Sequence, residues 1–172
     1  MSEGPGQKAS EDSAAPTRAR AKKILIVADR SPECRLALQF AGLRALHTGG
    51  RLALLYISEP ADFQHWLGVE AIMREEARAE AENVLHTLGT QVNRETGIVV
   101  EYAIREGRKR EVLIRHIEED PDIRLLVLGA GTGKEGPGPL VSAMAGEVAA
   151  SFPVPVTIVP GQMTPEEIEA LA

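Results

Sequence analysis

Residues 23–32 read KILIVADRSP, and this stretch combines a buried strand with the start of a helix. The run Lys23–Ala28 is apolar and rich in β-branched residues, which is typical of a strand covered on both faces. Ser31 and Pro32 then supply a helix N-cap and a first helical residue. A buried strand that leads through a short turn into a helix indicates an α/β fold with a parallel sheet.

The same alternation of strands and helices continues along the chain. Further strands are predicted at Arg51–Ile57, Ile98–Arg105, Arg124–Leu128 and Pro155–Val159. Intervening helices include a long one from Val69 to about Thr96 and one over Leu140–Ala149. Right-handed crossovers then give an α/β fold: a doubly wound, mostly parallel five-stranded sheet with helices on both faces. The third strand alternates apolar with polar residues, so we expect it in a less buried position.

Composition shifts divide the chain into three parts. Residues 1–21 are rich in Ser, Ala, Gly, Pro and charge, so we expect a disordered N-terminal tail. Residues 22–161 carry the alternating pattern and are predicted to form the α/β domain. Residues 162–172 are predicted to form a short helical extension, because Thr164 and Pro165 are typical of a helix start.

Size and composition exclude several classes of protein. The chain has 172 residues, a net charge of −6 and one cysteine. The acidic balance argues against nucleic-acid binding, and no apolar run approaches the roughly 18 residues that span a bilayer. The N-terminus lacks the apolar segment of a signal peptide. We therefore expect a cytoplasmic protein that binds neither nucleic acid nor a membrane, with Cys34 as a buried, inert thiol.

Ligands of doubly wound sheets bind outside the carboxyl ends of the strands, where the strand order reverses. The loops that reach this edge are Asp29–Pro32, Ser58–Trp66 and Gly129–Ser142. The third loop has glycine at positions 129, 131, 133, 136 and 138. Glycines let backbone amides approach an anion closely, so this loop is a candidate phosphate cradle.

The glycine-rich loop does not fit either common nucleotide-binding motif. A P-loop needs four residues before its Gly-Lys pair and Ser or Thr after it, but here three residues separate Gly129 from Gly133 and Glu135 follows Lys134. The Rossmann fingerprint belongs after the first strand, where this chain has no glycine. A tightly turning connector that binds nothing stays open as the alternative.

The sequence from Lys23 to about Gly161 resembles the universal stress protein family. The resemblance rests on KKILIVADRS at 22–31, RLALLYISEP at 51–60, RLLVLGAGTG at 124–133 and VPVTIVPG at 154–161. It implies the same α/β fold and a non-enzymatic role in a stress response or in signalling. It also implies an adenine nucleotide, ATP or AMP, as the ligand.

Nucleotide-binding members of that family carry Gly-x2-Gly-x9-Gly-[Ser/Thr] after the fourth strand. Without gaps, this pattern falls here on Gly129, Thr132, Ser142 and Ala143. Gly129 matches the pattern. Thr132 and Ser142 carry side chains where the family has glycine, and Ala143 lacks the hydroxyl that would donate to a phosphate. The phosphate end of the implied site is therefore altered.

The adenosine end of the implied site keeps more of the family pattern. Asp29 matches the acid that ends the family's first strand, and Ile57 matches the apolar position that ends the second. Arg30 replaces the usual glycine. We expect adenosine between Asp29 and Ile57, and any phosphates near Gly131–Gly133 and Ser142. Gly131, Gly133 and Gly136 are candidate replacement donors, and Lys134 is a candidate cation.

Three functional hypotheses stay open at this stage. The resemblance implies a homodimer whose contacts with protein partners depend on an adenine nucleotide. The departures at Thr132, Ser142 and Ala143 favour a dimerisation or adaptor module that binds no nucleotide. A small nucleotide hydrolase is the third hypothesis, and the lack of a Walker pair, of paired metal carboxylates and of a nucleophile motif counts against it.

The last strand predicts how two copies of the chain pair. Val154–Val159 is short and apolar, and as the last of five strands we expect it at a sheet edge, where unpaired backbone groups favour strand addition. It carries no Lys or Glu, and Pro153 and Pro160 limit pairing to a few residues. The resemblance implies the same antiparallel pairing. The alternative is a monomer in which the helix from Thr164 covers this edge.

Overall fold

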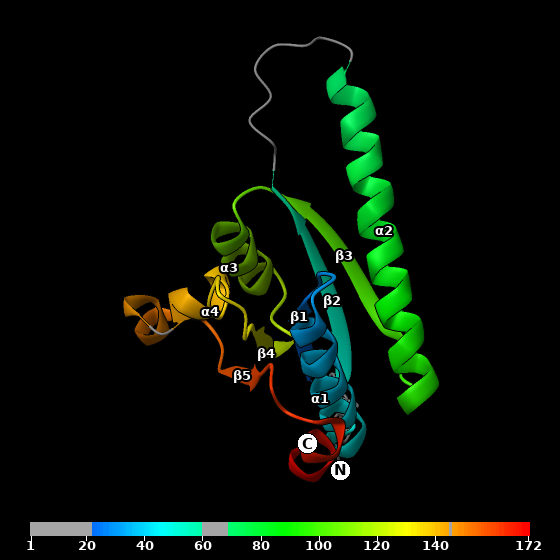
Figure 1. The fold of residues 1–172 in the computed structure, drawn as a ribbon, viewed down its shortest axis with the longest axis vertical. Helices are drawn as coiled ribbons and strands as arrows, with labels where there is room; N and C mark the ends of the chain where they lie inside the picture. Colours follow the sequence, from blue (N-terminus) through cyan, green and yellow to red (C-terminus); the bar gives the residue numbers. More distant parts are fainter. Residues whose placement is uncertain (1–21, 60–68, 145) are drawn as a thin grey trace, which may run out of the picture.

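The computed structural model describes residues 22–59, 69–144 and 146–172, so the predicted tail at 1–21 lies outside the described residues. Five parallel strands form one sheet with the order β3-β2-β1-β4-β5 (Figure 1). The strands are β1 Lys23–Val27, β2 Arg51–Ser58, β3 Val100–Glu106, β4 Ile123–Ala130 and β5 Val156–Pro160. The helices are α1 Pro32–Thr48, α2 Val69–Thr96, α3 Lys109–Glu119, α4 Pro139–Met144 and α5 Pro165–Leu171. The predicted α/β fold is confirmed, and β3, as expected, is not central.

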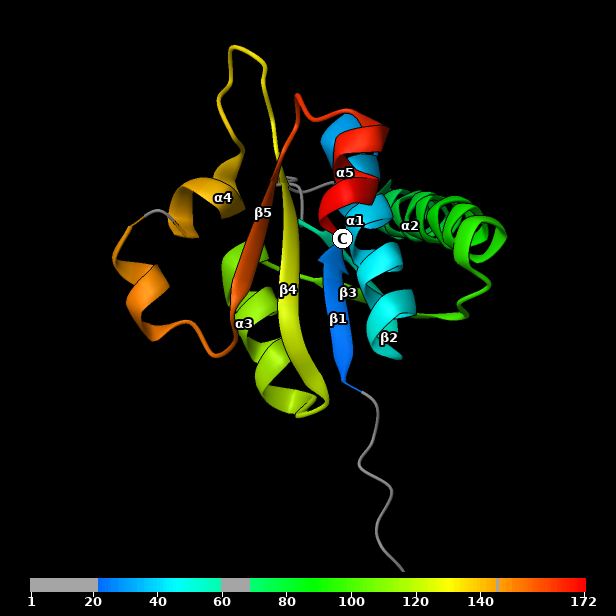
Figure 2. The ribbon, with the colours of Figure 1, turned by 90° about the horizontal axis from the view of Figure 1, so that it is seen from below.

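Two layers of helices cover the sheet (Figure 2). Helices α1, α2 and α5 pack on one face, and α3 and α4 pack on the other. Neighbouring residues of β2 show the alternation, because Leu54 faces the α1 layer and Leu55 faces the α3 layer, both fully buried. The inner strands β1, β2 and β4 are buried on both faces and therefore require nearly continuous apolar runs, whereas β3 and β5 at the edges are more exposed.

The first strand–helix unit forms as the sequence predicts. The Ser31 hydroxyl accepts a hydrogen bond from the amide of Cys34 at 3.1 Å, and Pro32 begins α1. At the other end Gly49 adopts a left-handed conformation with φ 63° and closes the helix. These two caps fix the length of α1 and the direction in which it leaves β1.

Helix α2 has 28 residues and extends along the β2–β3 side of the sheet (Figure 1). Its exposed face carries an ion pair between Arg78 and Glu82 at 3.0 Å, which is the spacing that the sequence indicates for a solvated surface. No helix in the described part of the chain has the length and hydropathy to cross a membrane.

The single helix expected over Leu140–Ala149 is wrong. Helix α4 ends at Met144, and Glu147–Ser151 forms a separate 3-10 helix. Gly146 lies between them with φ −107° and ψ −156°, an extended backbone that ends the α-helical hydrogen bonding. The glycine-rich loop is therefore followed by fewer than two helical turns.

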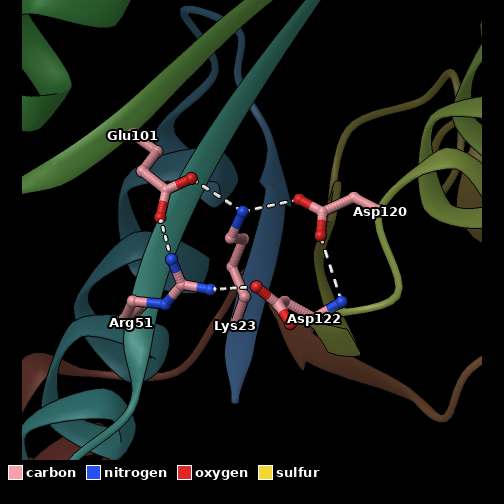
Figure 3. Close-up of polar contacts among 5 residues, drawn as sticks. All are labelled: Lys23, Arg51, Glu101, Asp120 and Asp122. Atoms are coloured by element: carbon pink, nitrogen blue, oxygen red, sulfur yellow. Dashed lines mark hydrogen bonds and ion pairs between the residues drawn. The ribbon is translucent and has the colours of Figure 1, made fainter. Parts of the chain in front are cut away.

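Five charged residues join the amino ends of β1, β2 and β3 to the turn between α3 and β4 (Figure 3). The Lys23 ammonium lies 2.5 Å from Asp120 and 2.7 Å from Glu101. Arg51 contacts Glu101 at 2.9 Å and Asp122 at 2.6 Å. Because Lys23 is 6% exposed, these carboxylates supply the pairing that a buried ammonium needs.

The network shifts the pKa values of two of its members. Burial acts to lower the pKa of Lys23, but the hydrogen bonds and charges of Asp120 and Glu101 outweigh burial and raise it. Burial acts to raise the pKa of Asp120, but hydrogen bonds from Lys23 and from the amide of Asp122 outweigh it and lower the pKa. Both charged forms are therefore favoured in the folded chain.

The pH dependence of stability tests this network. A carboxyl group whose pKa is lowered by folding stabilises the folded chain above its unfolded pKa of roughly 3.9, and this stabilisation is lost as the pH falls through the folded value. We expect urea unfolding to show a steeper loss of stability below about pH 4 in the wild type than in Asp120→Asn. Glu118→Gln, at an exposed carboxyl of α3, is the control. Equal slopes in the wild type and Asp120→Asn would contradict the role of Asp120.

Candidate functional site

The carboxyl edge of the sheet contains the point where the strand order reverses. The reversal lies between β1 and β4. After β1 the chain crosses one face of the sheet through α1 to reach β2, and after β4 it crosses the other face through α4 to reach β5. Val27 pairs with Leu55, and Ile26 pairs with Val127. By this register the loop after β1, the end of β2 and the end of β4 reach the same edge of the sheet.

The Asp29 carboxylate is exposed and held by the turn that begins α1. Its Oδ1 atom accepts hydrogen bonds from the Ser31 amide at 2.8 Å and from the Ser31 hydroxyl at 2.5 Å. Ile57 lies at the same level of the sheet but is 6% exposed, within the core on the α3 face. Of these two predicted adenosine contacts, Asp29 therefore presents a polar group to solvent and Ile57 mainly supports the core.

A charged rim lies beside Asp29 and was not predicted from the sequence. Arg30, from the loop after β1, forms an ion pair with Glu80 of α2. Burial raises the pKa of the half-buried Tyr56, and the charge of Glu80 adds to this effect. The positions 30 and 80 are far apart in the sequence, so no local pattern indicates their pairing.

Two glycines at the carboxyl ends of β4 and β5 allow main-chain contacts that no side chain would permit. A Cβ atom on Gly129 would lie 2.2 Å from the carbonyl oxygen of Glu33 in the first turn of α1. A Cβ atom on Gly161 would lie 2.4 Å from the carbonyl oxygen of Ala130. Gly129, the motif position that the sequence matches, is therefore required for packing whether or not a ligand binds.

The glycine-rich loop uses several of its amides internally. The Gly131 amide donates to Pro137 at 3.3 Å, and the Gly136 amide donates to Gly133 at 3.1 Å. Within the described residues, no hydrogen bond of the chain uses the amides of Thr132 or Gly133, and both residues are exposed. The amides of the exposed residues Lys134 and Glu135 also have no partner in the described part of the chain, so the donors that this loop offers to a ligand include residues 132–135.

The remaining predicted site residues lie in α4. Ser142 is exposed, but its amide donates to the carbonyl of Gly138 at 2.9 Å. Ala143 is half-buried and packs against the core on the α3 face. The predicted loop at 58–66 is described as far as Glu59, and the rest of it lies outside the described residues.

The cysteine next to this site is buried, as predicted. Cys34 is 4% exposed, and burial raises the pKa of its thiol to about 12. Its Sγ atom lies 3.7 Å from the carbonyl oxygen of Val27. A protonated, enclosed thiol is not a nucleophile at neutral pH.

A hollow of about 450 Å³ lies between α2 and β3. Its lining residues are Arg78, Glu82, Leu85, His86, Tyr102 and Ile104. The Tyr102 phenol lies against Gly89, where a Cβ atom would be 1.8 Å from the hydroxyl oxygen. This groove is at the β3 edge, separated by β2 from the strand-order reversal, and no local sequence pattern indicates it.

The fold agrees with what the sequence comparison finds. The model of the Universal stress protein family matches residues 20–160, and the chain therefore belongs to the universal stress protein family. No curated protein sequence matches the chain.

Solved structures of the family share the fold at low sequence identity. The universal stress protein UspA from Lactobacillus plantarum has a TM-score of 0.64 at 20% identity, covering 82% of this chain and 99% of that one. A universal stress protein in complex with cAMP has a TM-score of 0.57 at 16% identity, covering 84% and 100%. A family protein from Arabidopsis thaliana with AMP bound has a TM-score of 0.54 at 17% identity, covering 81% and 91%.

Two alanine substitutions test the packing role of Gly129. Gly129→Ala should lower the free energy of unfolding by about 3 kcal/mol and the melting temperature by about 10 °C, because the new methyl group meets the backbone of α1. Gly133→Ala is the matched control, since nothing lies within 4 Å of its added Cβ, and it should change stability by less than about 0.5 kcal/mol. Thermal unfolding that gives both variants equal stability would contradict the close contact.

Proposed function

We propose that this chain is a non-enzymatic signalling protein of a stress response that binds an adenine nucleotide at the carboxyl edge of its sheet. The observation that carries the proposal is that the loops after β1 and β4 flank the reversal of strand order and present complementary polar groups. Asp29 offers an exposed carboxylate, which accepts hydrogen bonds from amino and hydroxyl groups. The amides of Thr132 and Gly133 offer donors to a phosphate oxygen.

The relatives support the choice of ligand class. One family structure was solved with cAMP and another with AMP. Both ligands combine an adenosine with a single phosphate group. The two kinds of polar group at this edge, a carboxylate and free backbone amides, suit a ligand that contains both an adenosine and a phosphate.

The groups nearest the site support binding rather than catalysis. The Ser31 hydroxyl accepts a hydrogen bond from the Cys34 amide and donates one to Asp29, so it serves as a helix cap. The Cys34 thiol is buried with a raised pKa. Neither side chain is an activated nucleophile, and this argues against the hydrolase hypothesis.

An adaptor without nucleotide binding is the second candidate. The adaptor is favoured because the amides of Gly131 and Ser142 already donate to carbonyls within the chain and are therefore not free to donate to a phosphate. It is also favoured by the side chains at Thr132 and Ser142. Direct measurement of nucleotide binding separates the two candidates.

Titration calorimetry with AMP tests the proposed site. The wild type should bind, and Asp29→Asn should weaken binding about tenfold or more, because a charge-assisted hydrogen bond is lost. Asn keeps the acceptor oxygen that holds Ser31, so the melting temperature should stay close to that of the wild type. Glu118→Gln, an equal loss of charge on α3, should bind like the wild type. If titration with millimolar AMP gave no binding heat, the adaptor without nucleotide binding would be favoured.

We also propose that two copies pair through β5. The Leu126 amide donates to Pro155 at 3.0 Å, and the Gly161 amide donates to Ala130 at 2.9 Å. Since backbone groups alternate in direction along a strand, the amides of Val156 and Ile158 are directed away from β4. Helix α5 packs on α1, with Ile168 buried in that face, and lies apart from β5 (Figure 2). This arrangement argues against α5 as a cover for the edge.

Light scattering after gel filtration tests the dimer. The wild type should have twice the chain mass of 18.5 kDa at tens of micromolar. Ile158→Pro should give a folded monomer, because it deletes an outward amide at a position whose side chain is 40% exposed. Gln162→Pro, beyond the strand, should stay dimeric. A wild-type mass near 18.5 kDa would contradict the pairing.

A further inference from the structure

The first turn of α1 carries a carboxylate that lies against the glycine-rich loop. The Oε1 atom of Glu33 is 3.0 Å from the position that a Cβ atom on Gly131 would occupy. The Cβ atom of Glu33 is 3.4 Å from the corresponding position at Gly161. Glu33 is half-buried, and its backbone is held against Gly129, so its side chain stays at the base of the loop.

This carboxylate opposes two features that would otherwise attract an anion. The amino end of α1 carries a partial positive charge, and glycine-rich loops expose backbone amides. Glu33 places a negative charge beside both of them. The Gly131 amide, in the residue that the Glu33 carboxylate approaches, already donates to the carbonyl of Pro137.

The rest of the loop adds little positive charge. Lys134 is exposed at the loop surface, and Glu135 directly follows it with the opposite charge. The amides of residues 132–135 have no partner in the described part of the chain, so the number of donors does not by itself limit how many phosphates the loop can hold. Each phosphate beyond the first would, however, bring more negative charge toward Glu33.

We propose that Glu33 makes this site selective for adenine ligands with no more than one phosphate, and that it disfavours ATP. The inference rests on the proposed function, since it concerns the same site. Repulsion between Glu33 and each added phosphate is stronger than between two fully exposed groups, because the half-buried carboxylate is partly removed from water. Glu33 acts as a specificity-determining residue through charge and not through shape.

Binding of adenosine, AMP and ATP to the full chain, measured by calorimetry at neutral pH and low salt without divalent cations, tests the inference. In the wild type, AMP should bind at least about tenfold more tightly than ATP. Glu33→Gln should reduce this AMP-to-ATP preference by about tenfold and leave the adenosine affinity unchanged. Glu118→Gln removes the same charge from α3 and should leave the preference unchanged. Added salt should weaken the preference in the wild type more than in Glu33→Gln.

The outcomes separate this inference from the proposed function. If adenosine and AMP bind but ATP binds as tightly as AMP, or if Glu33→Gln keeps the wild-type preference, the role of Glu33 is overturned and the nucleotide site stands. If none of the three ligands binds to either protein at millimolar concentration, the nucleotide site itself is overturned, and the inference with it. ATP binding by Glu33→Gln but not by the wild type would support the role of Glu33 directly.

Discussion

The contact between the first turn of α1 and the end of β4 is the constraint on which the candidate site depends. The carbonyl of Glu33 lies where a side chain at Gly129 would be, so the backbones of α1 and β4 are in direct contact. This approach brings the Asp29–Ser31 turn next to the glycine-rich loop, across the boundary where the strand order reverses. It also brings the Glu33 carboxylate to Gly131. The close approach at Gly129 thus determines both the position of the candidate site and the charge beside it.

The two edges of the sheet differ in how their polar groups are used. At the amino edge, Lys23 and Arg51 are paired with three carboxylates that join β1, β2, β3 and the turn before β4 (Figure 3). At the carboxyl edge, Asp29 is exposed, and within the described residues the amides of Thr132 and Gly133 have no partner in the chain. The amino edge therefore holds the strands in register, and the carboxyl edge is the one suited to a ligand.

Local patterns predicted the fold because each element carries its own signal. Ser31 caps α1, Gly49 ends it, and the β-branched runs become strands buried on both faces. The break at Gly146 was missed, since apolar spacing continues across it while the backbone does not. The site was predictable only in outline. Sequence alone placed Asp29 and the glycine-rich loop at one edge, but the positions of Glu33 and of the internally bonded amides depend on tertiary contacts.

The most direct test of a nucleotide site at the carboxyl edge is a map of amide chemical shifts in the full chain titrated with AMP. We expect the largest changes at the amides of residues 29–31 and 131–133, with Lys23 and Arg51 at the amino edge unaffected. Largest changes in the α2–β3 groove, at His86 and Tyr102, would place the ligand elsewhere and contradict this account. A spectrum unchanged at millimolar AMP would contradict it as well.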